Sequence, residues 1–450
     1  MKKDAFSRVN AVNRKDKNTL KSAFDIARSY RNHILKPVLN PIVLESGKGV
    51  VVFDKDGNGY LDLTTGGGVF LLGYHNALTD EVRRAALRQM EKISHIPHYI
   101  YYSEQAARLA EKLAAVAPGP LNRMFFCNSG SEAVEGAVRV VRKHKQRFEI
   151  LALQQGFAGR TMGAASLTGL SSAKKGIGPL LPGVHHLPAP ACRHCSIGHT
   201  YPSCELACAR YCEDYLQFAT CGDVAAVIAE PVLGDAGVIV PPPEYLAQLD
   251  AVCRRHDIAF VADETLSGLG RTGKMFAIEH SGVTPDVLTL GKALGGGFPL
   301  GAFIVSDAVA PVFEYEDFSS TAGGNPVACA AGAATIDIIR REGLVEQAAA
   351  TGAYFKQCLE QLAGRWPAIA DVRGQGLFMG VEIGALTAEM PAPAAAAAVK
   401  AALVCAGFLV DIFGGATLRL TPPLIFEKKH VERFTQGLHD VLSALDDSVK

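Results

Sequence analysis

The sequence predicts an α/β protein in which a large domain with a mainly parallel sheet is joined by a smaller α+β domain. Between about residues 65 and 325, short apolar runs alternate with helical patterns. Each run is apolar on both faces, as a buried parallel strand requires. The composition agrees with this prediction, because 48% apolar and 20% charged residues in a chain of 450 exclude a disordered or fibrous protein.

Residues 1–64 are expected to form a polar tail and a small meander that belongs to the smaller domain. Residues 1–20 are polar and mixed in charge, whereas residues 41–63 alternate apolar and polar side chains around the turn sequence DGNG. An amphipathic helix is expected over residues 78–93, with Thr79 as its N-cap.

Six apolar runs are expected to form the buried strands of the large domain, residues 65–325. They are residues 123–127, 148–153, 225–231, 258–264, 287–291 and 301–305. Residues 326–450 are predicted to be the smaller domain. In it, helical stretches flank short strands and a low-complexity alanine run at 391–403.

The net charge and the lack of a visible targeting signal limit the expected partners and the expected location of the protein. Lys+Arg equals Asp+Glu at 45 each, so no global field favours nucleic acid or an anionic membrane as a partner. The chain shows neither a signal sequence nor a run of about 18 apolar residues. Together with the odd number of cysteines, 11, this pattern favours a soluble cytoplasmic protein with reduced thiols.

Three features at the ends of the expected strands indicate residues that bind a ligand or take part in catalysis. Residues 128–131, Asn-Ser-Gly-Ser, open a helix whose free N–H groups suit a phosphate, although a plain N-cap is an alternative. Asp263 ends a buried run and suits a buried cation such as a protonated pyridine nitrogen, unless it only caps a turn. Lys292 precedes a run of three glycines and suits a Schiff base, unless it lies on the surface.

These features follow one another along a single α/β core and are followed by the small-residue turn SSTAGGNP. Pyridoxal phosphate needs such a set of groups. From about Pro41 to Leu424 the chain resembles the class III pyridoxal-phosphate aminotransferases of fold type I. The matching segments are NSGSEAVEGAVRVVR, GFAGRTMGA, IAEPVLGDAGVIVPP, ADETLSGLGRTG, LGKALGGGFPLGA, STAGGNPVACAAG and LRLTPPL.

The resemblance implies catalytic and phosphate-binding roles for four residues. Lys292 resembles the lysine that joins the cofactor as a Schiff base and moves protons. Asp263 resembles the carboxylate that keeps the pyridine nitrogen protonated, so that the ring accepts electrons. Gly130 and Ser131 resemble the pair that binds the phosphate.

Three further residues are implied to contact the cofactor. Phe157 resembles the aromatic residue that stacks on the ring, and Glu230 is the buried acid of the EPV motif. Thr321 resembles the threonine that reaches the phosphate of the neighbouring subunit's cofactor. The last role implies an obligate homodimer, alone or as a dimer of dimers, with active sites at the interface.

Two arginines are implied to bind substrate carboxylates. Arg160 lies where GABA and ornithine aminotransferases have an arginine for the distal carboxylate of glutamate, and Arg419 resembles the arginine for an α-carboxylate. In those relatives a glutamate of a GEGG turn pairs with the second arginine and releases it to the substrate. Here the turn reads Gly-Asp-Ala-Gly, and the shorter Asp235 predicts a looser switch or none. Ordinary surface salt bridges are the alternative.

The resemblance implies an aminotransferase that moves an amino group from an ω-amino acid, a diamine or a related amine to 2-oxoglutarate or pyruvate. Two departures from the family pattern, Leu266 and the shortened Asp235, leave room for a rival, an amino-acid racemase or epimerase of the same family. Leu266 replaces a glutamine that bonds the cofactor's phenolic oxygen, and Thr265 replaces a valine under the ring. Losing that donor changes how the charge on the oxygen is stabilised.

A cysteine-rich segment stands apart from the catalytic motifs. Six of the 11 cysteines lie between residues 192 and 221. A Cys-x2-Cys pair followed by two nearby thiols is typical of a metal site, for zinc or an iron–sulfur cluster. The quartet is Cys192, Cys195, Cys204 and Cys208. A loop of reduced, half-buried thiols is the alternative.

Overall fold

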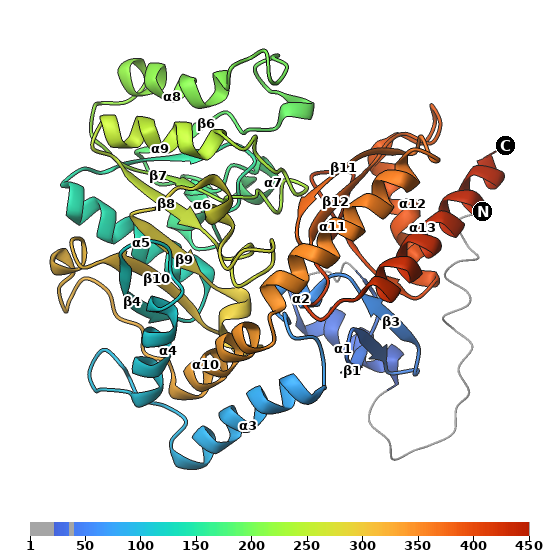
Figure 1. Cartoon of the computed structure of the whole chain (residues 1–450), viewed down its shortest axis with the longest axis horizontal. Coiled ribbons are helices and arrows are strands. Elements are labelled where there is room, and N and C mark those ends of the chain that lie inside the picture. The colour runs from blue at the N-terminus through green and yellow to red at the C-terminus, as the bar shows by residue number, and fades with distance from the viewer. Residues whose placement is uncertain (1–21, 36–39, 450) are drawn as a thin grey trace.

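The computed structural model describes residues 22–35 and 40–449, so the tail predicted for residues 1–20 lies outside the described residues. Figure 1 shows two lobes. One contains a seven-stranded sheet between layers of helices, and the other contains a four-stranded sheet under long helices. This architecture confirms the predicted α/β class. The domain boundaries at residues 64 and 325 stay predictions.

The seven-stranded sheet is the frame of the larger lobe. Its strands are β4 (Leu121–Cys127), β5 (Glu149–Leu153), β6 (Val184–Leu187), β7 (Val224–Ala229), β8 (Ala259–Asp263), β9 (Val287–Leu290) and β10 (Gly301–Ser306). Their order is β4-β10-β9-β8-β7-β5-β6. All six predicted runs lie in this sheet. The sequence VHHL of β6 escaped prediction because two histidines interrupt its apolar character; His185 pairs with the Glu149 carboxylate at 2.7 Å.

The direction of the strands gathers their carboxyl ends. β10 is antiparallel to β4 and β9, while β9, β8, β7, β5 and β6 are parallel to one another. β4 therefore points the same way as the parallel strands. Ligands of open α/β sheets bind beyond the carboxyl ends of the strands, so this edge is the expected place for a site.

Helices cover both faces of this sheet (Figure 1). On one face α5 (Gly130–Lys145) packs against the central strands. Gly136 permits this close packing, because a Cβ there would lie 2.2 Å from the Phe303 ring. On the opposite face lie α8 (Ala207–Phe218) and α9 (Tyr245–Arg255), which contact β6 and β8.

A second group of helices packs at the base of the larger lobe. The buried α10 (Pro326–Arg341) contacts both α3 (Ala77–Lys92) and α4 (Glu104–Ala114). The predicted N-cap Thr79 is wrong, because α3 begins one turn earlier. The Asn76 side chain accepts the Thr79 N–H at 3.0 Å, and the Thr79 hydroxyl accepts the Asn76 N–H at 2.8 Å. This reciprocal pair is a capping box.

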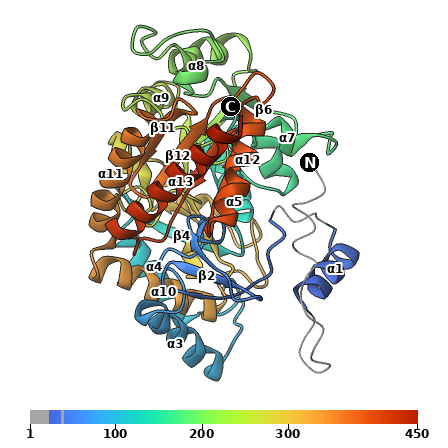
Figure 2. The same cartoon turned by 90° about the vertical axis from the view of Figure 1, so that its right-hand side faces the viewer.

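The N-terminal meander joins a strand from the far end of the chain. Its strands β1 (Leu44–Lys48), β2 (Val51–Asp54) and β3 (Gly59–Asp62) are antiparallel, and β13 (Phe408–Leu409) adds to β3 in parallel. Before the meander, α1 (Ala23–His33) buries none of its residues. Figure 2 shows this helix standing away from both lobes.

The smaller lobe has its own antiparallel sheet. Its strands, in sheet order, are β11 (Ile369–Gln375), β12 (Phe378–Ile383), β15 (Thr417–Leu420) and β14 (Asp411–Phe413). The long helices of this lobe are α11 (Leu344–Ala363), α12 (Ala392–Cys405) and α13 (Lys428–Val449). The alanine run that was predicted as low complexity forms α12, because alanine has the highest helix propensity and Pro391 precedes the first turn.

Short helical turns complete the fold. They are α2 (Thr65–Gly68), α6 (Met162–Leu167), α7 (Ser171–Lys174), η2 (Cys192–His194), η3 (Ala277–Ser281), η4 (Lys292–Gly295) and η5 (Ala310–Val312). In the described ranges no helix is both long and apolar enough to cross a membrane. The predicted cytoplasmic location stays a prediction.

Candidate active site

Five residues predicted to serve the cofactor lie at or beyond the carboxyl ends of five strands that point the same way. In the order β4, β5, β7, β8 and β9, these residues are Gly130, Phe157, Glu230, Asp263 and Lys292. The paired positions Ala229–Ala262 and Asp263–Thr289 hold the last three strands in register. Segments far apart in the sequence therefore meet at the edge where a ligand is expected.

Asp263 is a buried carboxylate that is fixed on one side. It is 6% exposed. Its Oδ1 accepts the Thr265 N–H at 3.0 Å and the Thr289 hydroxyl at 2.9 Å. Burial raises the pKa of Asp263, against the effects of these hydrogen bonds and of the Lys292 charge. In the part of the chain that the structure describes, both of these hydrogen bonds use Oδ1, which leaves Oδ2 open to a cationic ligand atom.

Lys292 lies among charged groups of both signs. Burial lowers the pKa of its ammonium, while the charges of Asp235 and Asp263 oppose this effect. Its backbone φ of 42° is unusual for a residue with a side chain and lies at the sharp turn from β9 into η4. An amine with a lowered pKa is more often neutral and therefore a better nucleophile.

The helix that follows β4 begins next to the segment that follows Asp263. The Ser129 hydroxyl caps α5 by accepting the Glu132 N–H at 3.2 Å. A Cβ at Gly130 would lie 2.6 Å from the Thr265 side chain, so glycine allows the helix start to approach the segment after Asp263. In the part of the chain described, the N–H groups of Gly130 and Ser131 have no backbone partner, as at any helix start. They suit an anion.

Glu230 links the segment of Phe157 to the turn that follows β7. Its carboxylate accepts the Phe157 N–H at 2.7 Å and the Gly234 N–H at 3.1 Å. Burial and the nearby Asp263 raise the pKa of Glu230 to about 8. This residue therefore positions Phe157 and the Asp235 turn together.

Arg419 and Asp235, the predicted substrate residues, form an ion pair. The Arg419 Nη1 donates to the Asp235 Oδ1 at 2.6 Å, and the arginine is 6% exposed. The guanidinium carbon of Arg419 lies 3.4 Å from the centre of the Phe413 ring, so the cation stacks on an aromatic face. Both charges act on Lys292, which places the pair beside the amine.

Arg160 lies at the exposed mouth of the site. Its backbone N–H donates to the Ser131 hydroxyl at 3.0 Å, and its guanidinium lies 5.1 Å from the centre of the Phe157 ring. The structure thus brings Arg160 to the predicted phosphate and ring residues. Thr321 is exposed, and its role stays a prediction; its neighbour Ser320 accepts a hydrogen bond from Asn128 at 2.9 Å.

Leu266 forms an apolar wall of the site. A Cβ at Gly68 would lie 2.4 Å from one of its methyl groups, and a Cβ at Gly234 would lie 2.5 Å from the other. The same Cβ at Gly68 would lie 3.5 Å from the Lys292 side chain. Leu266 therefore packs between two glycines, and its side chain offers no hydrogen bond to a ligand.

The residues at this edge fit pyridoxal phosphate. Asp263 has an oxygen free for the protonated ring nitrogen, and Lys292 supplies the amine for the aldehyde. The start of α5 at Gly130 has N–H groups for the phosphate, and Phe157 supplies an aromatic face. The assignment of each residue to its part of the cofactor stays a prediction.

The structure does not support the metal site that was predicted at Cys192, Cys195, Cys204 and Cys208. All four line one narrow crevice, but the described residues contain no group of three or more His, Cys, Asp or Glu placed to hold a metal ion. Burial raises the pKa of Cys208 to about 11 and also raises that of Cys192. His194 instead bonds to Glu382 of the smaller lobe at 2.7 Å.

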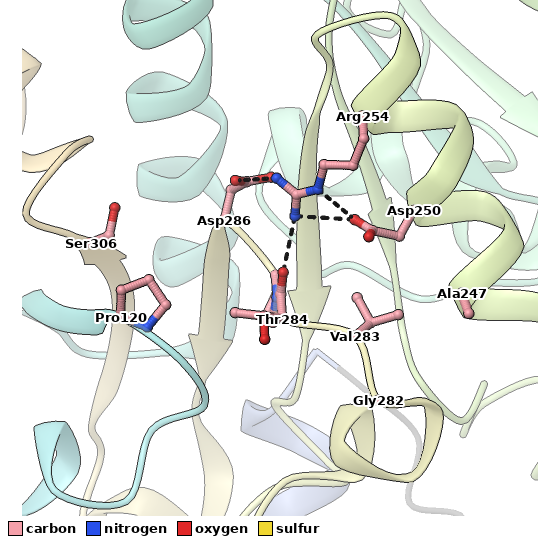
Figure 3. A pocket seen from close by; sticks show the side chains of 10 residues that line it. Pro120, Ala247, Asp250, Arg254, Gly282, Val283, Thr284, Asp286 and Ser306 are labelled. Atoms are coloured by element: carbon pink, nitrogen blue, oxygen red, sulfur yellow. Dashed lines mark hydrogen bonds and ion pairs between the residues drawn. The ribbon is translucent and has the colours of Figure 1, made fainter.

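A surface cavity of about 470 Å³ lies at the other edge of the sheet, near the start of β9 (Figure 3). Its charged side chains pair with one another, since Arg254 donates to Asp286 at 2.8 Å and to Asp250 at 3.1 Å. Away from the carboxyl ends of the strands and with its charges already paired, this cavity is not the active site.

Sequence reasoning missed three residues that support the site. Thr289 bonds Asp263, Phe413 stacks on Arg419, and Arg373 holds the turn that contains Asp235. A threonine inside the otherwise apolar run VLTLG was a usable signal for Thr289. The other two depend on strand pairing in the smaller lobe and have no local signal.

Comparisons with known proteins agree with this geometry. The family model of class III aminotransferases matches residues 34–442. The chain is 37% identical over 405 residues to an acetylornithine aminotransferase of Methanothermobacter thermautotrophicus, covering 90% of this chain and 95% of the relative. It is 34% identical over 414 residues to a leucine/methionine racemase of Thermococcus litoralis, covering 90% and 91%.

A solved structure has the same fold over nearly the full length. It is a thermostable (S)-enantioselective omega-transaminase from Thermomicrobium roseum, with a TM-score of 0.87 and 31% identity, covering 95% of this chain and 99% of that one. Family match, relatives and site geometry lead to the same conclusion. The chain belongs to the class III aminotransferases, which are pyridoxal-phosphate enzymes of fold type I.

Proposed function

We propose that this aminotransferase takes an amino group from an ω-amino acid, a diamine or a related amine and passes it to 2-oxoglutarate or pyruvate. One observation carries the proposal: Arg419, the buried arginine beside Lys292, is already paired with Asp235 at 2.6 Å, whereas Arg160 is exposed. An amine without an α-carboxylate leaves the pair intact. A keto acid brings a carboxylate that replaces Asp235 on Arg419.

In the proposed reaction, some residues of the site bind the cofactor and another transfers the proton. Bound pyridoxal phosphate supplies an electron sink for the reacting carbon. Asp263 keeps the ring nitrogen protonated through its free Oδ2. With the cofactor bound, Lys292 would hold its aldehyde, and the Lys292 Nζ would carry the proton from the donor carbon. Phe157 and Leu266 keep water away from the reacting atoms.

The relative named acetylornithine aminotransferase supports a donor of this class, since ornithine is a diamino acid. A second candidate is an amino-acid racemase, which returns the proton to the opposite face of the carbon and releases no keto product. The relative named leucine/methionine racemase supports it, as does Leu266, which provides no donor for the cofactor's phenolic oxygen. The fate of the proton distinguishes the two reactions.

Exchanging the buried arginine tests the proposed acceptor. Arg419→Gln is expected to raise the KM for 2-oxoglutarate and pyruvate about 10- to 100-fold, because a charge-assisted hydrogen bond to the α-carboxylate is lost. The kcat/KM for a diamine that lacks a carboxylate should change by less than about threefold. Arg254→Gln, at the opposite edge of the sheet, is the control. An unchanged KM for both keto acids in Arg419→Gln would contradict the proposal.

We further propose that the active enzyme is a homodimer, alone or within a dimer of dimers, in which Thr321 of each chain reaches the partner's phosphate site. Large apolar side chains on α3 and the segment after it are exposed to solvent, which is unusual for a monomer. They are Leu87, Met90, Ile93, Ile100, Tyr101 and Tyr102. Light scattering should give two or four times the chain mass of 47.7 kDa; a monomer that is active at assay concentration would exclude the shared site.

A further inference from the structure

The turn that contains Asp235 lies against one face of the smaller lobe's sheet, between two arginines. Strand pairing places Arg373 opposite Gly380 and Gly380 opposite Arg419. Paired residues of neighbouring strands point to the same face, so both arginines flank Gly380. A Cβ at Gly380 would lie 3.1 Å from the Gly237 carbonyl oxygen. The missing side chain therefore lets the turn settle between the two guanidinium groups.

Arg373 holds the end of this turn. Its Nη2 donates to the Gly237 carbonyl at 2.7 Å, and its Nε lies 3.0 Å from the same oxygen and 3.1 Å from the Val238 carbonyl. The backbone φ of Gly237 is 96°, and a Cβ there would lie 3.3 Å from the Arg373 Nη2. Glycine is thus needed for the guanidinium to approach the backbone.

The remaining donors of Arg373 are bound as well, so this arginine is a fixed anchor. Nη1 donates to Asp371 at 2.6 Å and to Glu382 at 2.7 Å, and Nη2 also donates to the Thr417 hydroxyl at 2.9 Å. Such a fork cannot be matched by lysine. Arg419, by contrast, makes a single side-chain hydrogen bond within the described residues, to Asp235.

We propose that Arg373 is a positioning residue that holds the Asp235 turn against the sheet and thereby sets how strongly Asp235 competes with a substrate α-carboxylate for Arg419. The proposal rests on the carboxylate-binding role of Arg419 given above. One arginine holds the turn permanently and the other releases it when a keto acid arrives. A loosened turn lowers the local concentration of the Asp235 carboxylate at Arg419, so an α-carboxylate binds more tightly.

A double-mutant cycle with Asp235→Asn and Arg373→Lys tests this coupling. The readouts are the Kd of glutarate for the holoenzyme by calorimetry and the KM for 2-oxoglutarate. Asp235→Asn is expected to lower both about tenfold, and Arg373→Lys about threefold. The double variant should match Asp235→Asn within twofold, because the anchor acts only through the carboxylate. Gly380→Ala, which pushes the turn off the sheet, should act like Arg373→Lys and serves if that variant does not fold.

His194→Ala is the matched control, since it removes another partner of Glu382 without touching the turn; its Kd and KM should stay at the wild-type values. Effects of Asp235→Asn and Arg373→Lys that multiply, or a rise in Kd for Arg373→Lys, would overturn the positioning role. Wild-type enzyme that binds glutarate but does not turn over either keto acid would instead overturn the proposed function, while the glutarate cycle would still decide the role of Arg373.

Discussion

Lys292→Ala is expected to lower the rate of amino transfer by at least about 10⁴-fold, because the variant loses both the amine that joins the cofactor and the group that moves the proton. No other lysine follows a strand end at this edge of the main sheet in the described chain. The rate should be measured with saturating amine and keto acid at a fixed cofactor concentration, with the melting temperature as a check on folding.

Lys274→Ala is the matched control for this change. Lys274 is an exposed lysine in the segment GRTGK, which lies between Asp263 and Lys292 in the sequence. It should keep the wild-type rate within about twofold, as surface substitutions generally do. If Lys292→Ala retained wild-type turnover, another residue would have to supply the amine, and the assignment of this site would be wrong.

Asp263→Asn is expected to lower kcat by about 10²- to 10³-fold, the usual cost of removing one preorganised electrostatic partner. Asparagine keeps an oxygen that can accept the bonds from Thr265 and Thr289. Its amide nitrogen, however, replaces the oxygen that is free to accept from a protonated ring. The variant should therefore keep its fold and lose the charge that holds the ring nitrogen protonated.

The neighbouring carboxyl Glu264 provides the control for Asp263→Asn. It is equally buried, but its oxygens accept the Ser267 hydroxyl at 2.6 Å and the Ile278 N–H at 2.7 Å, away from the open site. Glu264→Gln is expected to change stability more than kcat. Equal losses of kcat in Asp263→Asn and Glu264→Gln would mean that both carboxyl groups serve only the fold, and that Asp263 has no specific role toward the ring nitrogen.

The edge of the sheet that carries Asp263 and Lys292 was predictable because its sequence signals are local. Each buried strand appears as a short apolar run, and Asp263 and Lys292 stand where such a run ends. Parallel pairing then brings the ends together, so chain order alone was enough to group them. The N-cap of α3 could not be predicted in the same way. Asn76 and Thr79 are both residue types that favour the N-cap, and in the structure the helix begins after Asn76.

The features that escaped prediction depend on contacts between distant segments. Arg373, Gly380 and Arg419 share a row of the smaller lobe's sheet only because β12 pairs with both β11 and β15. The local sequence does not predict the register of these strands. The metal site predicted at the cysteine quartet lacks support for the opposite reason. Its spacing is local and typical of a metal site, but the four cysteines, of which only Cys208 is buried, line a narrow crevice and form no ligand set among the described residues.

The central claim is that the enzyme transfers an amino group, and a single half-reaction tests it most directly. Holoenzyme is mixed with an excess of an ω-amino acid or a diamine without any keto acid, and in parallel with leucine or methionine in deuterated water. The account predicts one equivalent of carbonyl product per active site, together with conversion of the cofactor to its amine form. Deuterium uptake and inversion of the α-amino acid, with no carbonyl product from any donor and an unchanged cofactor, would contradict it and identify a racemase.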